Sequence, residues 1–322
     1  MSARRVADPS IGLLGRASRI ALFGVTFAWA LALCQASDQF GGPQASANTV
    51  WIHATVTDAK GQLVTTLRQE DFIVVSNGKP QALSVFSTEQ VPVSVALMLD
   101  MSGSMAGVVP NISRATEALV TQFKRGDRIN IGTFKSDVLV SSRFTSNRDS
   151  ILHGVDRMIV GADIPCAPPS KTLTSGPVPT RRGGSAIWDG VECSIWALDR
   201  DAEAFRRVAL LVTDGDDNAS YGNVVTATNF ANRTGVIIYA IGLSRGMTAT
   251  DLSHLASATG GSYFSLDRRA DFTEAFRQVG EEIHAQYILG FEPAQPGSVG
   301  SLKVTTRNPG LTVRARHGYA PK

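Results

Sequence analysis

The sequence predicts an α/β domain with a doubly wound, mostly parallel sheet, inserted in a small Ig-like β-sandwich that the N- and C-terminal flanks form together. Val93–Leu99 and Val208–Val212 are almost continuously apolar, as parallel strands covered on both faces are. Between Val93 and His284, strand-like runs alternate with helix-like runs, which indicates crossover connections in a parallel sheet. Both flanks instead contain strand-like segments and turns.

Periodicity and capping residues predict the other elements of the α/β part. A helix over Asn147–Ile159 has Ser146 or Asn147 as its cap, and a helix over Thr250–Ala258 has Thr250 or a nearby residue as its cap. The stretch from Gly161 to Gly184 is rich in Pro, Ser and Gly and is predicted to be a long irregular loop, a length that favours a functional role. Further helices are predicted over Ile112–Phe123, Ser185–Ala202, Asn223–Arg233 and Asp271–His284, and further strands over Arg128–Phe134, Val236–Ile241 and Gly261–Ser265.

The two flanks are predicted to fold together. Val50–Val56 alternates apolar and polar residues, and Asn77-Gly78 is a hairpin signal between Asp71–Val75 and Gln81–Phe86. After Gln286 the chain returns to strand-like segments, which are Tyr287–Phe291, Leu302–Thr306 and Leu311–Ala315. Neither flank has enough strands to be stable alone, so one sandwich interrupted by an insertion is expected.

The expected organisation has five parts. Residues 1–36 are a signal peptide and residues 37–48 a linker. Residues 49–90 form the first part of the sandwich, residues 91–285 the α/β domain, and residues 286–322 the second part of the sandwich.

The first residues indicate export to the periplasm, the cell envelope or the extracellular space. Four arginines precede the apolar run Ile20–Leu33, which is followed by Cys34-Gln35-Ala36, and cleavage after Ala36 is expected. Three alternatives remain open: lipidation at Cys34, a twin-arginine signal at Arg4-Arg5, and an uncleaved membrane anchor. The membrane is expected as a partner only through such a lipid or anchor.

The net charge bears on whether the partner is strongly anionic. The formal net charge of the chain is +3, and residues 1–36, with four arginines and one aspartate, account for all of it. A neutral mature protein gives no reason to expect nucleic acid or an anionic membrane surface as a partner. Beyond Cys34 the chain has two cysteines, Cys166 and Cys193, which form a disulfide candidate in an exported protein; two unpaired small apolar residues are the alternative.

Hard oxygen ligands follow the predicted strands. Asp100, Ser102 and Ser104 come directly after the first apolar run, Ser185 follows the glycine pair Gly183-Gly184, and Asp214 ends the second apolar run. Ligand sites of open α/β sheets form at the carboxyl ends of the strands, and carboxylate and hydroxyl oxygens suit a cation such as Mg²⁺. Taken alone, the Asp-x-Ser-x-Ser segment has a plainer interpretation, with Ser102 or Ser104 capping a helix.

The combination of these segments resembles a von Willebrand factor A (VWA) domain, a Rossmann-like fold. The resemblance implies a metal-ion-dependent adhesion site made of Asp100, Ser102, Ser104, Ser185 and Asp214. It implies Mg²⁺, with Mn²⁺ or Ca²⁺ as alternatives, and a coordination position open to an acidic side chain of a partner. Ser185 departs from the usual threonine; it keeps the hydroxyl but loses the methyl that restricts χ1, so metal binding is expected to survive.

The flanks are similar to those of VWA-related proteins described from acidobacteria. The matching stretches are Val56-Thr57-Asp58, Asp71-Phe72, Asn77–Gln81 and Gly310–Pro321. That family has no established biochemical role, so this resemblance bears on the fold.

The leading functional hypothesis is an exported, divalent-metal-dependent protein-binding module of adhesion type, whose partner is a protein that offers a carboxylate. The alternative is a structural component of a cell-envelope complex that docks through the β-sandwich, with the metal site as a structural brace.

An enzyme is not expected. Gly103–Gly107 fits G-x-S-x-G, but Asp100 and Ser102 explain the same turn as a metal site, and His254 and His284 are predicted on helix surfaces. Asp216 and Asp217 are interpreted as a solvated acidic turn with Asn218 as a possible cap. Trp188 and Trp196 are interpreted as core residues, with Trp188 bordering the site.

Overall fold

A computed structural model describes residues 46, 48–158, 164–173, 184–201, 205–243, 247–267 and 271–320. These residues belong to one compact unit, Phe40–Lys322. The expected signal peptide and most of the expected linker lie outside the described residues. Within the described part of the chain, no helix is long and apolar enough to cross a membrane.

The α/β part is built around a seven-stranded sheet in the described residues, with the order β11-β10-β9-β5-β6-β7-β8. Its first five strands are parallel, and β7 and β8 extend one edge in antiparallel fashion. The strands are β5 (Val93–Asp100), β6 (Arg128–Phe134), β7 (Val138–Val140), β8 (Ile164–Cys166), β9 (Arg206–Thr213), β10 (Ile237–Gly242) and β11 (Tyr263–Ser265).

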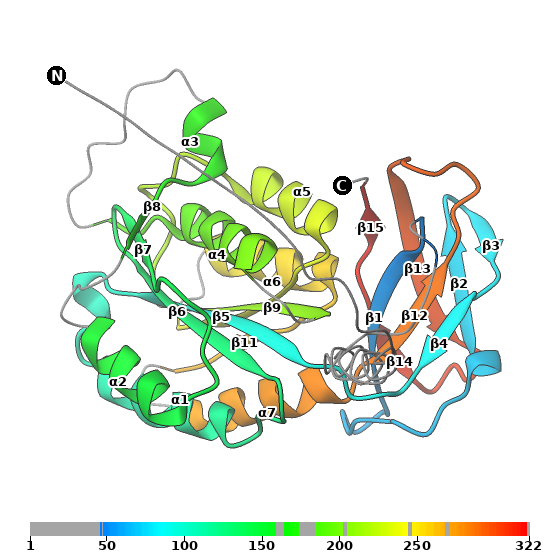
Figure 1. Ribbon diagram of the computed structural model, residues 1–322, viewed down its shortest axis with the longest axis horizontal. Helices are drawn as coiled ribbons and strands as arrows, with labels where there is room; N and C mark the ends of the chain where they lie inside the picture. Colours follow the sequence, from blue (N-terminus) through cyan, green and yellow to red (C-terminus); the bar gives the residue numbers. More distant parts are fainter. Residues whose placement is uncertain are drawn as a thin grey trace, which may run out of the picture. The chain divides into compact units, whose positions relative to one another are not determined.

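Helices cover both faces of this sheet, so the predicted doubly wound arrangement is confirmed (Figure 1). On one face lie α1 (Val109–Val120), α2 (Arg148–Met158) and α7 (Phe272–His284). On the other lie α4 (Ile187–Asp201), α5 (Val224–Thr234) and α6 (Met247–Thr259). Alternate residues of β5 enter the two apolar clusters, with Val95 and Leu97 on one face and Ala96 and Met98 on the other. This explains the continuous apolar run, because each face of the strand meets helices.

The flanks form two antiparallel sheets that share one apolar core. One sheet has the order β14-β1-β12-β4 and the other β15-β13-β2-β3, so each combines strands from both ends of the chain. The predicted interrupted sandwich is confirmed in this form, and the narrower Ig-like description stays a prediction. The strands are β1 (Val50–Thr57), β2 (Phe72–Ser76), β3 (Lys79–Gln81), β4 (Val85–Ser87), β12 (Tyr287–Phe291), β13 (Gly300–Thr306), β14 (Thr312–Arg314) and β15 (Gly318–Tyr319).

The predicted hairpin is present between β2 and β3. Asn77 and Gly78 adopt φ angles of 49° and 76°, the left-handed conformation that a two-residue hairpin turn needs. The strand predicted over Gln81–Phe86 was wrong as a single element. The chain leaves β3 at Gln81 and joins the other sheet at Val85, where β4 pairs with β12.

Two other predictions need correction. The stretch Gly161–Gly184 contains a short strand, β8, and a short helix, α3 (Pro169–Leu173), so its described part is not irregular throughout. Helix α6 begins at Met247, so Thr250 lies inside it and does not cap it.

Two further predictions are confirmed. Asn147 caps α2, because its side chain accepts a hydrogen bond from Ser150 N at 2.8 Å. Cys166 of β8 and Cys193 of α4 form a disulfide, which joins the edge strand to the helix that follows Ser185.

Candidate metal centre at the carboxyl edge of the sheet

Asp100 ends β5 with its side chain fully buried. Its Oδ1 accepts a hydrogen bond from Ser102 N at 2.8 Å, and its Oδ2 accepts one from Thr213 Oγ1 at 2.6 Å. A buried carboxylate is costly unless such donors or a cation compensate it. Thr213 is the last residue of β9, which pairs with β5, so the parallel register itself brings the two side chains together.

The two serines of the Asp-x-Ser-x-Ser segment turn toward each other and toward the neighbouring strand. Ser102 Oγ and Ser104 Oγ lie 3.1 Å apart, and Ser104 Oγ donates to Asp214 Oδ1 at 2.8 Å. Ser102 stands at the N-cap position of the short 3₁₀ helix Gly103–Met105, but its side chain makes no capping hydrogen bond. The simple helix-cap interpretation of Ser102 therefore does not describe this turn.

Ser185 reaches the same cluster from a distant segment. Its Oγ donates to Asp100 Oδ1 at 3.3 Å. Its backbone is held by Asn218, whose Oδ1 accepts from Ser185 N at 3.0 Å and whose N donates to Ser185 O at 3.2 Å. Asp217 Oδ1 accepts from Ile187 N at 2.8 Å at the start of α4. The interpretation of Asp216 and Asp217 as a solvated turn holds for Asp216, which is exposed. It was wrong for Asp217, which is half-buried and, together with Asn218, fixes the segment that carries Ser185.

The five predicted ligands thus form one hydrogen-bonded cluster at the carboxyl edge of β5 and β9. Asp100, Ser102, Ser185 and Asp214 are buried, whereas Ser104 is exposed, so the cluster opens to solvent on one side. The donor set of two carboxylates and three hydroxyls fits a hard divalent cation, because such ions take oxygen ligands. Within the described residues, no group of three or more His, Cys, Asp or Glu side chains is arranged to hold a metal. Metal ligation by the five residues stays a prediction.

A second polar network supports the loops behind the cluster. The carboxylate of Asp189 in α4 accepts hydrogen bonds from Tyr221 N and Gly222 N at 3.0 and 3.1 Å. Burial raises the pKa of Asp189 to about 6, the two backbone donors oppose this shift, and the nearby Glu192 and Asp217 add to it.

Sequence reasoning missed the supporting roles of Thr213, Asp217, Asn218 and Asp189. Thr213 and Asp217 had a usable signal, since both lie within three residues of Asp214. Asp189 had no such signal, because its partners lie on a loop more than thirty residues away.

The structure also shows where the two tryptophans of α4 lie and where His254 and His284 lie. Trp188 of α4 is buried in the core, and Trp196 of the same helix packs at the margin of that core, as predicted. His254 is exposed on α6, also as predicted. His284 was predicted on a surface and is instead buried, with Nε2 2.7 Å from Asp127 Oδ2 and Nδ1 2.7 Å from Gly280 O. Gly280 belongs to the same helix, α7, and Asp127 also accepts a hydrogen bond from Val93 N.

Comparison with known families gives one match. Residues 95–216 match the von Willebrand factor type A domain. This stretch includes Asp100, Ser102, Ser104, Ser185 and Asp214. No curated protein matches the chain.

Several solved structures are similar to this chain. A von Willebrand factor type A protein from Catenulispora acidiphila is 14% identical, with 86% of this chain and 76% of that chain covered and a TM-score of 0.48. Proximal thread matrix protein 1 from the mussel byssus, solved with a zinc-occupied MIDAS motif, is 17% identical, with 65% and 49% covered and a TM-score of 0.48. An aerotolerance-related membrane protein from Bacteroides fragilis is 17% identical, with 59% and 98% covered and a TM-score of 0.44. The narrower resemblance to the acidobacterial proteins stays a prediction. The family match and the α/β architecture agree on a von Willebrand factor type A domain within this chain, matched over residues 95–216.

Proposed function

We propose that this protein is an exported, divalent-metal-dependent protein-binding module, which captures an acidic side chain of a partner through a metal at the carboxyl edge of its sheet. One observation carries the proposal. Side chains from three segments that are far apart in the sequence form one hydrogen-bonded cluster. Ser104 Oγ donates to Asp214 Oδ1 at 2.8 Å, and Ser185 Oγ donates to Asp100 Oδ1 at 3.3 Å.

The donor set supports a metal of the Mg²⁺ class, with Mn²⁺ and Ca²⁺ as the alternatives. The five residues supply three neutral hydroxyls and two carboxylates. Where the aspartates act through water, as they often do in the family that this site resembles, few direct carboxylates would leave the ion incompletely neutralised, and it would favour a further negative ligand. A bound divalent cation would supply an electrophilic centre for an oxygen ligand. The chain's own contribution is to hold the oxygens in place, and the contacts of Thr213 and Asn218 do so.

The difference in exposure supports capture of a partner from solvent. Asp100 is fully buried, whereas Ser104 of the same cluster is exposed. A carboxylate that approaches past Ser104 would reach the cluster without displacing core residues. The partner is therefore proposed to be a protein with an exposed Asp or Glu.

Export is supported by two features of the chain. The N-terminal arginines followed by Ile20–Leu33 are typical of a signal segment. The disulfide between Cys166 and Cys193 is typical of proteins in oxidising compartments. The periplasm, the cell envelope and the extracellular space all fit these features.

The alternative is a structural component of the cell envelope that docks through the β-sandwich and uses the cluster as a brace. It has its own support, because Asp100 already accepts hydrogen bonds from three donors and thereby ties three loops together. No catalytic role is proposed. Covalent labelling of Ser102 or Ser104 by a fluorophosphonate would overturn that choice.

An affinity experiment separates capture from bracing. The purified protein is passed over immobilised acidic peptides and over their amide counterparts, with Mg²⁺ or with EDTA. Capture predicts retention that needs Mg²⁺ and a carboxylate and that disappears in Asp100→Ala but survives in Asp216→Ala, whose side chain is exposed next to the cluster. Bracing predicts no metal-dependent retention, together with a lower unfolding temperature in EDTA.

A further inference from the structure

A cavity of about 800 Å³ lies at the opposite edge of the parallel sheet from the candidate metal centre. The residues that line it come from both the β-sandwich and the α/β domain. The sandwich supplies Trp51 and His53 of β1 and Arg316 of the segment after β14, and the α/β domain supplies Arg207 of β9. Arg207 and Thr213 lie near opposite ends of β9, about 20 Å apart at the rise of an extended strand. The volume is in the range of sites for small molecules.

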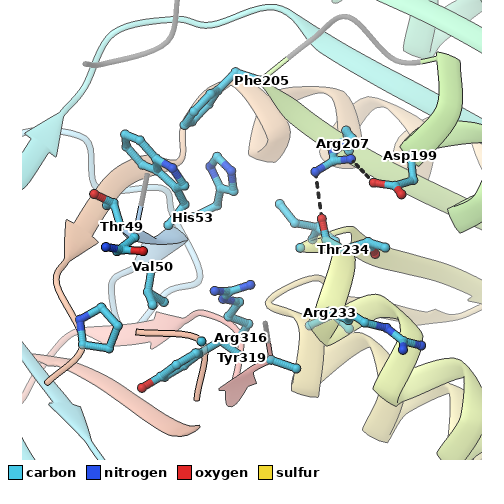
Figure 2. Close-up of a pocket in the computed structure, with 18 of the residues that line it drawn as sticks. Thr49, Val50, His53, Asp199, Phe205, Arg207, Arg233, Thr234, Arg316 and Tyr319 are labelled. Carbon is cyan, nitrogen blue, oxygen red and sulfur yellow. Dashed lines mark hydrogen bonds and ion pairs between the residues drawn. The ribbon is translucent and has the colours of Figure 1, made fainter. Parts of the chain in front are cut away.

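The cavity holds one positive charge that no carboxylate balances. Among the described residues that line it, Asp199 is the one carboxylate, and it is paired with Arg207 at 2.7 Å. Arg233 is exposed and its guanidinium lies over the ring of Phe230, 5.6 Å from the centroid. Figure 2 shows Arg316 extending into the open space, whereas Arg233 extends away from it.

Arg316 has few partners of its own. Its Nη1 donates to Asn232 O at 3.5 Å, a long hydrogen bond, and its Nε is buried with no acceptor among the described residues. A buried donor without a partner is uncommon in folded proteins and suggests a ligand that would accept from it. Burial lowers the pKa of Arg316 to about 10, in a region where an anion would be attracted more strongly than in water.

The other wall of the cavity is aromatic. The rings of Trp51 and Phe205 meet edge to face with centroids 4.8 Å apart, and His53 packs on Phe205 at 5.7 Å. Burial lowers the pKa of His53, and the charges of Arg206, Arg316 and Arg207 lower it further, which favours the neutral ring. This wall therefore offers apolar surface to a ligand and leaves the charge to Arg316.

We propose that this cavity binds a small organic monoanion, a carboxylate with an apolar or aromatic body. The carboxylate would pair with the guanidinium of Arg316, and the body would pack on Trp51 and Phe205. A carboxylate matches the planar donor fork of arginine, and one negative charge balances the one unpaired cation. A phosphate dianion would leave a charge unbalanced in the same space.

Titration calorimetry with benzoate, phenylpropionate and octanoate tests this proposal, with benzamide as the neutral counterpart and inorganic phosphate as the other anion. We expect saturable binding of at least one carboxylate and none of benzamide. Arg316→Gln should weaken that binding about 10- to 100-fold, as loss of a charge-assisted hydrogen bond does. Arg233→Gln, which changes the exposed arginine of the same rim, should leave it unchanged.

Two further variants keep the test decisive. Ser298→Trp, at a half-buried lining position, should block binding with Arg316 intact, so the test survives if Arg316→Gln does not fold. Binding should persist in EDTA and in Asp100→Ala, which separates this cavity from the metal centre. No saturable binding of any carboxylate, equal binding by Arg316→Gln, or tighter binding of phosphate would each overturn the proposal.

Discussion

Strand β9 joins two regions of opposite chemistry. It begins with Arg206 and Arg207, where the parallel sheet meets the β-sandwich, and it ends with Thr213 beside Asp214, in the candidate metal centre. At the carboxyl end, hydroxyls and carboxylates from neighbouring loops form a cluster suited to a cation. At the amino end, arginine side chains and aromatic rings surround a cavity suited to an anion.

The difference between these ends follows from how each is assembled. Four members of the carboxyl-end cluster lie at or just after the ends of the parallel strands β5 and β9, an arrangement that the α/β fold repeats at every crossover. The fifth, Ser185, comes from the segment that precedes α4. The amino-end cavity exists because the flanks fold back onto the sheet, with Arg206 donating to Ile283 O and Gln286 O at the connection between α7 and β12. The first region therefore belongs to the domain alone, and the second needs the sandwich.

The largest expected effect is on stability at the amino end. Arg206→Met should lower the free energy of unfolding by about 3 kcal/mol, because two buried carbonyls lose their donor. Arg207→Met is the matched neighbour. It loses a partly exposed ion pair with Asp199 and one hydrogen bond to Thr234 O, which together should cost about 1–2 kcal/mol. Urea unfolding measures both. Equal losses in the two variants would mean that Arg206 does not anchor the sandwich to the sheet.

A smaller effect is expected at the carboxyl end. Thr213→Val removes the hydroxyl that donates to Asp100 Oδ2, and this should cost about 1–2 kcal/mol of unfolding free energy in EDTA. Mg²⁺ affinity should fall about tenfold as well, because Asp100 would no longer be fixed. Thr121→Val is the control, since its hydroxyl bonds only locally, to Ala118 O, at an exposed helix end. Unchanged metal affinity would show that Thr213 has no part in the centre.

The pH dependence of stability tests the role of Asp189, which lies in the polar network behind the candidate metal centre. The pKa of Asp189 is raised from 3.8 to about 6 in the folded protein, so between these values the folded state holds a proton that the unfolded state has released. The free energy of unfolding should therefore decrease as pH rises through this window. Asp189→Asn should remove this part of the decrease. Chemical denaturation across that pH range measures it, and identical slopes for both proteins would contradict the assignment.

The smallest expected effect is on the Mg²⁺ affinity of a variant at Ser185, the one predicted ligand that departs from the usual set. Ser185→Thr should strengthen Mg²⁺ binding about two- to fivefold, because the β-methyl restricts the rotation of the hydroxyl. Calorimetry measures the change, with Ser194→Thr in the same region of the chain as the control. Weaker binding in Ser185→Thr would mean that the buried position has no room for the methyl group.

Sequence reasoning succeeded where local pattern decides the structure. The apolar runs at Val93–Leu99 and Val208–Val212 identified the central strands, and the polar residues after them identified the cluster, because strand ends and loop ligands are neighbours along the chain. Asn147 and Asn223 were placed at helix starts for the same reason, since caps act over three residues.

It failed where partners lie far apart in sequence. The run Gln81–Phe86 looks like one strand, but the sandwich divides it between two sheets. His284 lies on a helix as expected, yet Asp127, 157 residues away, determines that it is buried. The cavity was not foreseen at all, because Trp51, Phe205 and Arg316 come from three distant segments and none has a local signature.

Titration calorimetry of the protein with Mg²⁺ is the decisive test of the candidate metal centre. We expect saturable binding that is lost in Asp100→Ala and retained in Asp216→Ala, since Asp100 is buried in the cluster and Asp216 is exposed beside it. Saturable binding that Asp100→Ala leaves intact would place the metal elsewhere, and the absence of any Mg²⁺ or Mn²⁺ binding to the wild-type protein would contradict a metal centre formed by these residues.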